Sequence, residues 1–287
     1  MITFFKFLFN EIFYNGHFQT WGSLAIVIFS GQLLNIKITW DLLLIVYLSF
    51  YLIYLHDRYR SLEVDFLTNP IRSKHIKSIY KYIPSILIIG LLILISLLYY
   101  FSNIYAAIFI ILVTIFGFLY PLYFKGLTKK IIAFKNFYVS LVFSLLVILP
   151  NIYYQISLTR TTLLILLLLF IFTLLRGLMM QFFLDLKDIE GDKKEGLLTL
   201  GIVLGKEKVF KIINVINLFT SLSLPILYIA MPSLSLHPSI LFLVFLAIWN
   251  FYFFSLAKNG NFFGFILGSG EFIYWPLFVY IGELILK

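Results

Sequence analysis

Long runs of apolar residues follow one another along this chain, and they constrain its fold more than any other feature. About nine runs are each long enough to cross a bilayer as a helix of roughly 20 residues. Their approximate centres are Ile26, Val46, Ile93, Ile111, Phe143, Leu168, Leu218, Phe245 and Leu277. Hydrophobic residues make up 62% of the 287-residue chain and charged residues only 12%, which excludes an ordinary soluble domain. We therefore expect a single all-α domain over residues 1–287, a polytopic membrane bundle of about nine transmembrane helices.

The basic residues are unevenly distributed among the loops between these runs. The loops after the second, fourth, sixth and eighth runs contain nearly all of the Lys and Arg, whereas the opposite side has only Lys37, Arg160 and Lys287. Because Lys and Arg accumulate in cytoplasmic loops, this distribution predicts a cytoplasmic N-terminus and cytoplasmic loops after the even-numbered helices. We attribute the net charge of +9 to orientation and phosphate binding, not to nucleic acid.

Residues 1–16 are rich in apolar and aromatic side chains but lack the charge pattern and cleavage site of a signal peptide. We expect an amphipathic helix here that lies along the membrane surface. The chain has no cysteine, so any site chemistry must rely on oxygen and nitrogen groups.

An acidic motif ends the sixth apolar run, with the sequence Asp185-Leu-Lys-Asp188-Ile-Glu-Gly191-Asp192. Acids at positions i, i+3 and i+7 fall within one stripe of an α-helix, because each residue advances the helix by about 100°. Packed carboxylates repel one another, so a cation, most simply a divalent metal, would sit between them. A solvated helix end is the alternative interpretation.

A second acidic stripe follows the second apolar run. Asp57, Ser61 and Asp65 occupy positions i, i+4 and i+8 of an expected helix, which Asn69-Pro70 ends. Two such stripes, each followed by basic residues, suit a diphosphate held through Mg²⁺, because carboxylates bind the hard cation and the cation binds phosphate oxygens. A surface network of exposed ion pairs remains the alternative.

These motifs resemble those of the UbiA superfamily of intramembrane prenyltransferases, which has nine helices and two aspartate motifs after helices 2 and 6. The segment from Asp185 to Asp192, with Lys193-Lys194-Glu195-Gly196 behind it, is similar to the second motif of that family. The stretch Tyr120-Pro-Leu-Tyr123-Phe-Lys125-Gly-Leu-Thr-Lys129-Lys130, with Lys135-Asn136, resembles the loop after helix 4. The first motif departs from the pattern, because Ser61 stands where the family has its central Asp.

The resemblance implies an intramembrane prenyltransferase whose donor is a polyprenyl diphosphate. It implies that Mg²⁺ is held by Asp57, Asp65, Asp185, Asp188 and Asp192. It implies diphosphate contacts from Arg72, Lys125, Lys129, Lys130, Lys135 and Asn136, and a cavity lined by Ser61, Gln181, Tyr120 and Tyr123. The acceptor it implies is hydrophobic: an aromatic quinone precursor, a porphyrin or a glycerophosphate lipid.

Two other functions remain open, the first of them motivated by Ser61. One is a degenerate family member that binds or moves a prenyl lipid without transfer, and the other is a prenyl diphosphate hydrolase. A further expectation concerns Arg176, which lies nine residues before Asp185 and so on roughly the opposite face of a straight helix. We expect a structural partner for it on another helix.

Overall fold

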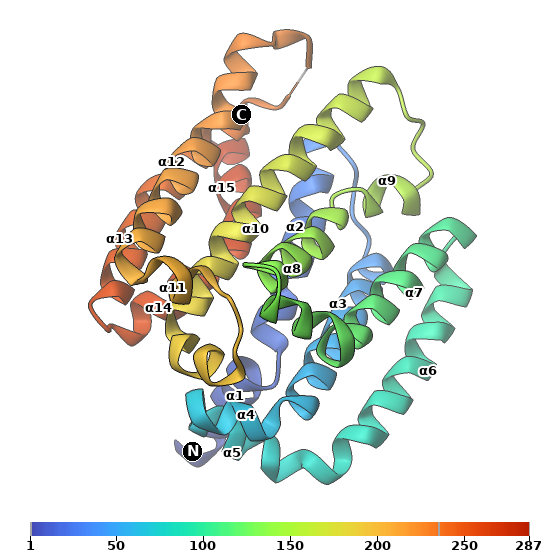
Figure 1. Ribbon diagram of the computed structural model, residues 1–287. Coiled ribbons are helices and arrows are strands. Elements are labelled where there is room, and N and C mark those ends of the chain that lie inside the picture. Colours follow the sequence, from blue (N-terminus) through green and yellow to red (C-terminus); the bar gives the residue numbers. More distant parts are fainter. Residues whose placement is uncertain (1, 235, 287) are drawn as a thin grey trace. The chain divides into compact units, whose positions relative to one another are not determined.

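The computed structural model describes residues 2–234 and 236–286, without the side chains of residues 2–6, 64, 67 and 68, and the regular structure of this part is helical (Figure 1). The α-helices are α1 (Ile2–Tyr14), α2 (His17–Leu33), α3 (Trp40–Arg60), α4 (Leu62–Thr68), α5 (Pro70–Ile79), α6 (Ile83–Phe101), α7 (Ile104–Leu119), α8 (Phe134–Leu145), α9 (Leu149–Tyr153), α10 (Arg160–Glu195), α11 (Leu200–Leu204), α12 (Lys206–Ala230), α13 (Phe245–Lys258), α14 (Phe262–Ser269) and α15 (Glu271–Ile285). Short tighter or wider turns join them at η1 (Tyr80–Tyr82), η2 (Tyr120–Phe124), η3 (Lys125–Lys129), η4 (Pro232–Leu234) and η5 (Pro238–Val244). The expected all-α architecture is confirmed.

The number of membrane-crossing segments is close to the nine expected. Within the described residues, seven helical segments are long and apolar enough to span a bilayer, and α14 with α15 adds an eighth if this pair, bent by 65°, is one span. The remaining expected span, around Ile26, is α2. Its 17 residues measure about 26 Å, at the lower limit for a transmembrane helix.

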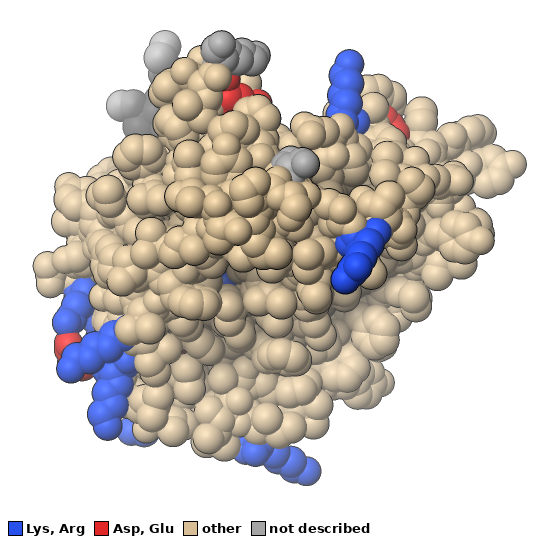
Figure 2. Space-filling view, turned by 90° about the horizontal axis from the view of Figure 1, so that it is seen from above, with Lys and Arg blue, Asp and Glu red and all other residues tan. Residues whose placement is uncertain are grey.

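The surface is consistent with a lipid environment. On α6, Ile88, Ile89 and Leu92 each expose more than half of their area. Figure 2 shows a face that is mostly uncharged, with several Lys and Arg side chains gathered at its left edge. Apolar exposure of this extent is the property of an integral membrane protein.

The chain divides into two compact units. Unit 1 contains residues 1–24, 39–135 and 188–198, and unit 2 contains residues 25–38, 136–187 and 199–287. In unit 1, α6 and α7 both pack on α3 (Figure 1). Glycine permits each contact, because a Cβ at Gly90 would lie 2.5 Å from Leu52 and one at Gly117 would lie 2.5 Å from Ile53.

Further contacts hold the helices together within each unit. In unit 1, the hydroxyl groups of Ser49 and Thr114 lie 2.8 Å apart and join α3 to α7. In unit 2, α12 packs on α13, α13 packs on α14, and η5 packs on both α12 and α15. In the core of unit 2, the ring of Trp275 packs edge-to-face with the rings of Phe29 and Phe172, which are themselves tilted by 31° to each other.

Candidate active site

The first acidic motif contains a helix break at Ser61. The expected continuous helix through Asp65 was wrong in detail, because α3 ends at Arg60 and α4 begins at Leu62. Ser61, between them, has φ −94° and ψ 4°, outside the helical region, although the backbone hydrogen bonds from Ser61 to Asp57 and from Asp65 to Ser61 are kept at 2.9 Å. The stripe therefore bends at Ser61 without being lost.

The expected helix end at Asn69-Pro70 is confirmed. Asn69 has φ −133° and ψ 61°, and Pro70 then occupies the first turn of α5. Proline suits that position because its missing N–H would have no helical partner there. The chain therefore turns at Asn69, and Asn69 and Arg72 lie together at the start of α5.

Asp65 lies at the centre of opposing electrostatic effects in unit 1. Burial raises the pKa of Asp65 above its ordinary value, and the negative charges of Asp57 and Asp188 act in the same direction. Arg72 and Lys125 act in the opposite direction. Arg72 contacts this carboxylate directly, with its Nη2 2.8 Å from Oδ2 of Asp65. The pKa of Asp65, in the first motif, is thus affected by the charge of Asp188, in the second motif.

A direct hydrogen bond joins the first motif to the second. Nδ2 of Asn69 donates to Oδ1 of Asp188 at 3.1 Å, and both residues belong to unit 1. Asn69 is only 9% exposed. The buried amide thus fixes the turn between α4 and α5 against the carboxyl-terminal part of α10.

Two lysines from other segments contact acidic residues near the carboxyl-terminal end of α10. Nζ of Lys135 lies 2.8 Å from Oδ1 and 2.7 Å from Oδ2 of Asp192, and the carboxylate is buried. Nζ of Lys125 lies 3.1 Å from Oε2 of Glu195. Charge-assisted contacts of this length are stronger than neutral hydrogen bonds.

Backbone contacts hold these lysines in place. The N–H of Leu198 donates to the carbonyl of Thr128 at 2.9 Å, and the N–H of Ala133 donates to the carbonyl of Leu198 at 2.8 Å. The hydroxyl of Thr128 also accepts from the N–H of Lys135 at 3.1 Å. The loop that follows α7 is thereby joined to the loop that follows α10.

The first aspartate of the second motif, Asp185, lies in unit 2 and has a different partner. Nδ2 of Asn136 donates to Oδ2 of Asp185 at 2.7 Å. Asn136 is fully buried, and its Oδ1 has no hydrogen-bond partner among the residues that the structure describes. A buried acceptor oxygen beside a carboxylate is the kind of environment that suits a hard cation.

The helical stripe predicted for the second motif is confirmed, because α10 runs without interruption through Asp185, Asp188 and Asp192. Asp185 and Asp192 are buried, whereas Lys187 and Glu190 of the same segment are exposed. This alternation is the pattern expected of an inward acidic face rather than a solvated helix end.

The other predicted site residues differ in their exposure. Asp57, Ser61, Tyr120 and Gln181 are half-buried, whereas Tyr123, Lys129 and Lys130 are exposed. Their roles toward a cavity or a diphosphate stay predictions.

The donor set fits magnesium in kind, because Mg²⁺ prefers carboxylate and other oxygen ligands. Within the part of the chain that the structure describes, no three His, Asp or Glu side chains are already arranged around a common metal position. Asp65 and Asp192 instead contact Arg72 and Lys135. These contacts use part of the acceptor capacity of each carboxylate, which has about four lone-pair sites.

Sequence reasoning missed two residues of this cluster. Asn69 was interpreted only as the end of a helix, although its side chain contacts Asp188. Glu195 pairs with Lys125, and its position three residues after Asp192 on α10 was a usable signal.

The expectation for Arg176 is confirmed in unit 2. Arg176 and Glu271 form an ion pair with both side chains fully buried. Nη1 of Arg176 also donates to Thr220 at 3.0 Å and to Ser221 at 2.8 Å, and Nε1 of Trp275 donates to Glu271 at 2.9 Å. The pair links α10, α12 and α15 away from the acidic stripe.

Together, the helices and the carboxylate, amide and lysine groups define an all-α integral membrane protein with an acidic site beside basic loops. Residues 70–262, about two thirds of the chain, match the UbiA prenyltransferase family. The chain belongs to the UbiA prenyltransferase family. The matched segment contains the second motif and the loops that follow α7 and α10. It begins after Asp57, Ser61 and Asp65.

Solved structures with the same fold include three that cover nearly the whole chain. A UbiA homologue from Aeropyrum pernix K1 has a TM-score of 0.69 at 14% identity, over 93% of this chain and 97% of that one. A digeranylgeranylglyceryl phosphate synthase has a TM-score of 0.59 at 18% identity, over 98% of both chains. A UbiA homologue from Archaeoglobus fulgidus bound to DMAPP and Mg²⁺ has a TM-score of 0.60 at 13% identity, over 92% of this chain and 95% of that one. A comparison with curated proteins finds no match.

Proposed function

We propose that this protein transfers a polyprenyl group from a prenyl diphosphate to a hydrophobic acceptor within the membrane, with Mg²⁺ as its cofactor. The observation that carries the proposal is the hydrogen bond between Asn69 and Asp188, because it brings residues of the first and second motifs into one cluster. Family membership supports the reaction class.

In this proposal, Asp57, Asp65, Asp185, Asp188 and Asp192 supply the carboxylates that hold Mg²⁺. The all-oxygen donors and the unpartnered Oδ1 of Asn136 support this assignment. The Archaeoglobus fulgidus homologues, which were solved with DMAPP or GPP and Mg²⁺, support the same choice of metal. The bound metal would stabilise the negative charge of the leaving diphosphate.

The basic residues would bind and orient the same diphosphate. Arg72, Lys125 and Lys135 already lie against acidic residues of the cluster. They would supply charge-assisted hydrogen bonds to phosphate oxygens. Lys129 and Lys130, exposed on the same loop, and Asn136 would complete the diphosphate contacts. Apolar helix walls would shield the allylic cation from water.

The acceptor classes remain those named from the sequence: an aromatic quinone precursor, a porphyrin or a glycerophosphate lipid. The likeness to a digeranylgeranylglyceryl phosphate synthase over 98% of both chains supports inclusion of the last class. We also propose that the N-terminus and the basic loops lie on the cytoplasmic side, on the basis of the loop charges.

One observation favours a second candidate function. Ser61 is half-buried at the junction of α3 and α4, so no carboxylate occupies the central position of the first motif. A weakened metal site there is compatible with a protein that binds a prenyl lipid without transfer, or with a hydrolase that uses water as the acceptor.

Product analysis separates these functions. Purified protein is incubated with labelled geranylgeranyl diphosphate, Mg²⁺ and one acceptor of each class. Transfer predicts a prenylated acceptor, hydrolysis predicts free prenyl alcohol, and a binding protein releases no diphosphate. Asp188→Asn is expected to abolish transfer, whereas Glu190→Gln, an exposed acid on the same helix, serves as the matched control. Equal activity of wild type and Asp188→Asn would overturn the proposal.

A further inference from the structure

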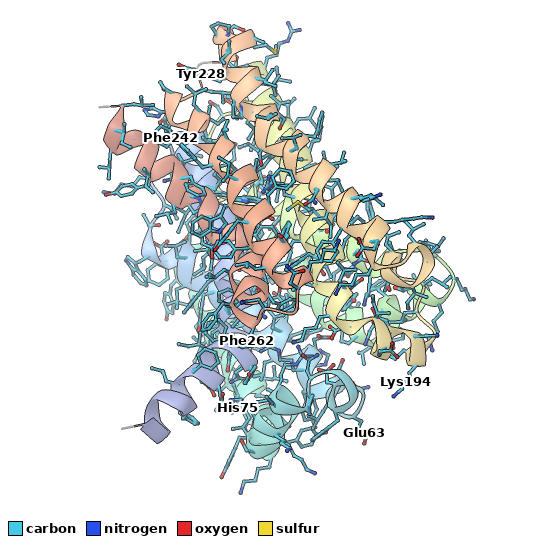
Figure 3. The ribbon with its side chains drawn as sticks, turned by 90° about the vertical axis from the view of Figure 1, so that its left-hand side faces the viewer. Glu63, His75, Lys194, Tyr228, Phe242 and Phe262 are labelled. Atoms are coloured by element: carbon cyan, nitrogen blue, oxygen red, sulfur yellow. The ribbon has the colours of Figure 1, made fainter. Side chains whose placement is uncertain are left out.

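His75, on α5, is enclosed by one face of the N-terminal helix α1. Its Nε2 lies 2.9 Å from Oε2 of Glu11, and its ring lies 6.1 Å from the ring of Phe7 and 6.5 Å from that of Tyr14. These three residues of α1 are four and three positions apart, so they share one helical face. Figure 3 shows His75 where α5 faces α1. The His75 side chain is 7% exposed.

The end of α1 is fixed independently to the helix that carries the first motif. Arg58 of α3 donates from Nη1 to the carbonyl of Tyr14 and from Nη2 to Oε1 of Gln19, the latter at 2.9 Å. Arg58 is buried, and Gly16 permits the close approach because a Cβ there would lie 2.9 Å from Tyr54 and 3.2 Å from Nη1 of Arg58. The helix α1 is therefore attached both to α3 and to α5.

Helix α5 connects this contact with α1 to the acidic motifs. His75 lies on α5 three residues after Arg72, and Asn69 directly precedes the first residue of this helix. Arg72 contacts Asp65, and Asn69 contacts Asp188. We therefore expect a displacement of α5 at His75 to move Arg72, less than one helical turn away, together with the turn that holds Asn69.

We propose that Glu11 and His75 are positioning residues, which set the place of Asn69 and Arg72 for binding of the prenyl diphosphate. The role of α1 then goes beyond lying at the membrane surface: it determines the geometry of the first acidic motif. This inference rests on the proposed function for its kinetic readout but not for its structural one.

The structural test uses the absence of native cysteine. Lys74→Cys on α5 and Lys194→Cys on α10, both exposed and both in unit 1, accept spin labels at defined positions. The label-to-label distance distribution is measured in the full chain by pulsed electron resonance. His75→Leu is expected to broaden or shift this distribution, and His75→Gln, which keeps a hydrogen-bond donor, is expected to restore it. An unchanged distribution in His75→Leu overturns the proposal, whether or not the protein is a transferase.

The kinetic test measures KM and kcat for geranylgeranyl diphosphate with Mg²⁺. Small misplacement of binding groups is costly, so His75→Leu and Glu11→Gln are each expected to raise KM by about tenfold, with kcat affected less. The double variant is expected to match the single variants, because both residues act through one contact.

The matched control is His17→Leu. His17 also lies near Glu11, at 3.7 Å, and stacks on Tyr51, but it belongs to α2 and not to α5. Its loss is expected to leave KM within about twofold of wild type. A KM increase in His17→Leu equal to that in His75→Leu would show general destabilisation and overturn the proposal. Wild-type protein with no diphosphate release would refute the proposed function, and the distance measurement would then decide the inference alone.

Discussion

Asn69 donates a side-chain hydrogen bond to Asp188 across 3.1 Å, although 119 positions separate the two residues in the sequence. The bond ties the turn between α4 and α5 to the second acidic motif. Asn69→Leu leaves the half-buried carboxylate of Asp188 without this donor and removes a hydrogen bond to a charged group. Donor affinity is expected to fall by about tenfold, as measured by equilibrium binding of labelled prenyl diphosphate with Mg²⁺. Asn103→Leu, which removes a helix cap on α7, is the control; equal affinities for Asn69→Leu and wild type would refute this role.

The buried pair of Arg176 and Glu271 is expected to contribute to folding rather than to chemistry. Arg176→Met leaves Glu271 buried without its cation, which costs about 3–5 kcal/mol and lowers the thermal midpoint in detergent. Arg176→Met combined with Glu271→Gln removes both charges and is expected to recover part of the loss. Lys258→Met, which removes an exposed ion pair with Glu207, is expected to leave the midpoint unchanged. A double variant less stable than Arg176→Met would contradict this account.

The pH dependence of stability should report on Glu11. Contact with His17, and then the hydrogen bond with His75, hold the pKa of Glu11 below its ordinary value of 4.5. Because the folded-state pKa is depressed, the stability contributed by Glu11 is fully present above pH 4.5 and is lost as the pH falls through the folded pKa. Glu11→Gln is therefore expected to lower the thermal midpoint at pH 7, with a difference from wild type that shrinks in strong acid. A constant difference at every pH, or one matched by the exposed control Glu63→Gln, would count against it.

Ser61 offers a gain-of-function test. Ser61→Asp supplies a carboxylate one helical turn from both Asp57 and Asp65. If the first motif holds Mg²⁺, the Mg²⁺ concentration for half-maximal donor binding should fall severalfold, because ligand charge strengthens binding of a hard cation. Ser61→Ala is the control for loss of the hydroxyl alone. Unchanged Mg²⁺ dependence in Ser61→Asp would place the metal elsewhere.

The features that the sequence predicted well are those fixed by local periodicity. The acidic stripe of α10 follows from the spacing of its three aspartates, and Pro70 places a helix boundary at Asn69 through its own backbone restriction. The expectation of a structural partner for Arg176 followed from helical geometry in the same way.

The features it did not predict depend on contacts between distant segments. The hydrogen bonds of Asn69 with Asp188 and of His75 with Glu11 depend on the packing of distant segments and not on neighbouring residues. The break at Ser61 and the 65° bend between α14 and α15 are likewise not determined by apolar run length. The shortness of α2 shows the limit of counting apolar residues, since the run around Ile26 supports a helix of only 17 residues.

The central claim is that the acidic cluster uses Mg²⁺ to release diphosphate from a prenyl donor. The most direct measurement is single-turnover release of diphosphate from labelled geranylgeranyl diphosphate by the purified full-length protein, with Mg²⁺ and after its removal by chelation. The account predicts release that requires Mg²⁺, returns when Mg²⁺ is added back, and falls by at least about 100-fold in Asp188→Asn. Release that persists without divalent metal, or that is undiminished in Asp188→Asn, would contradict it.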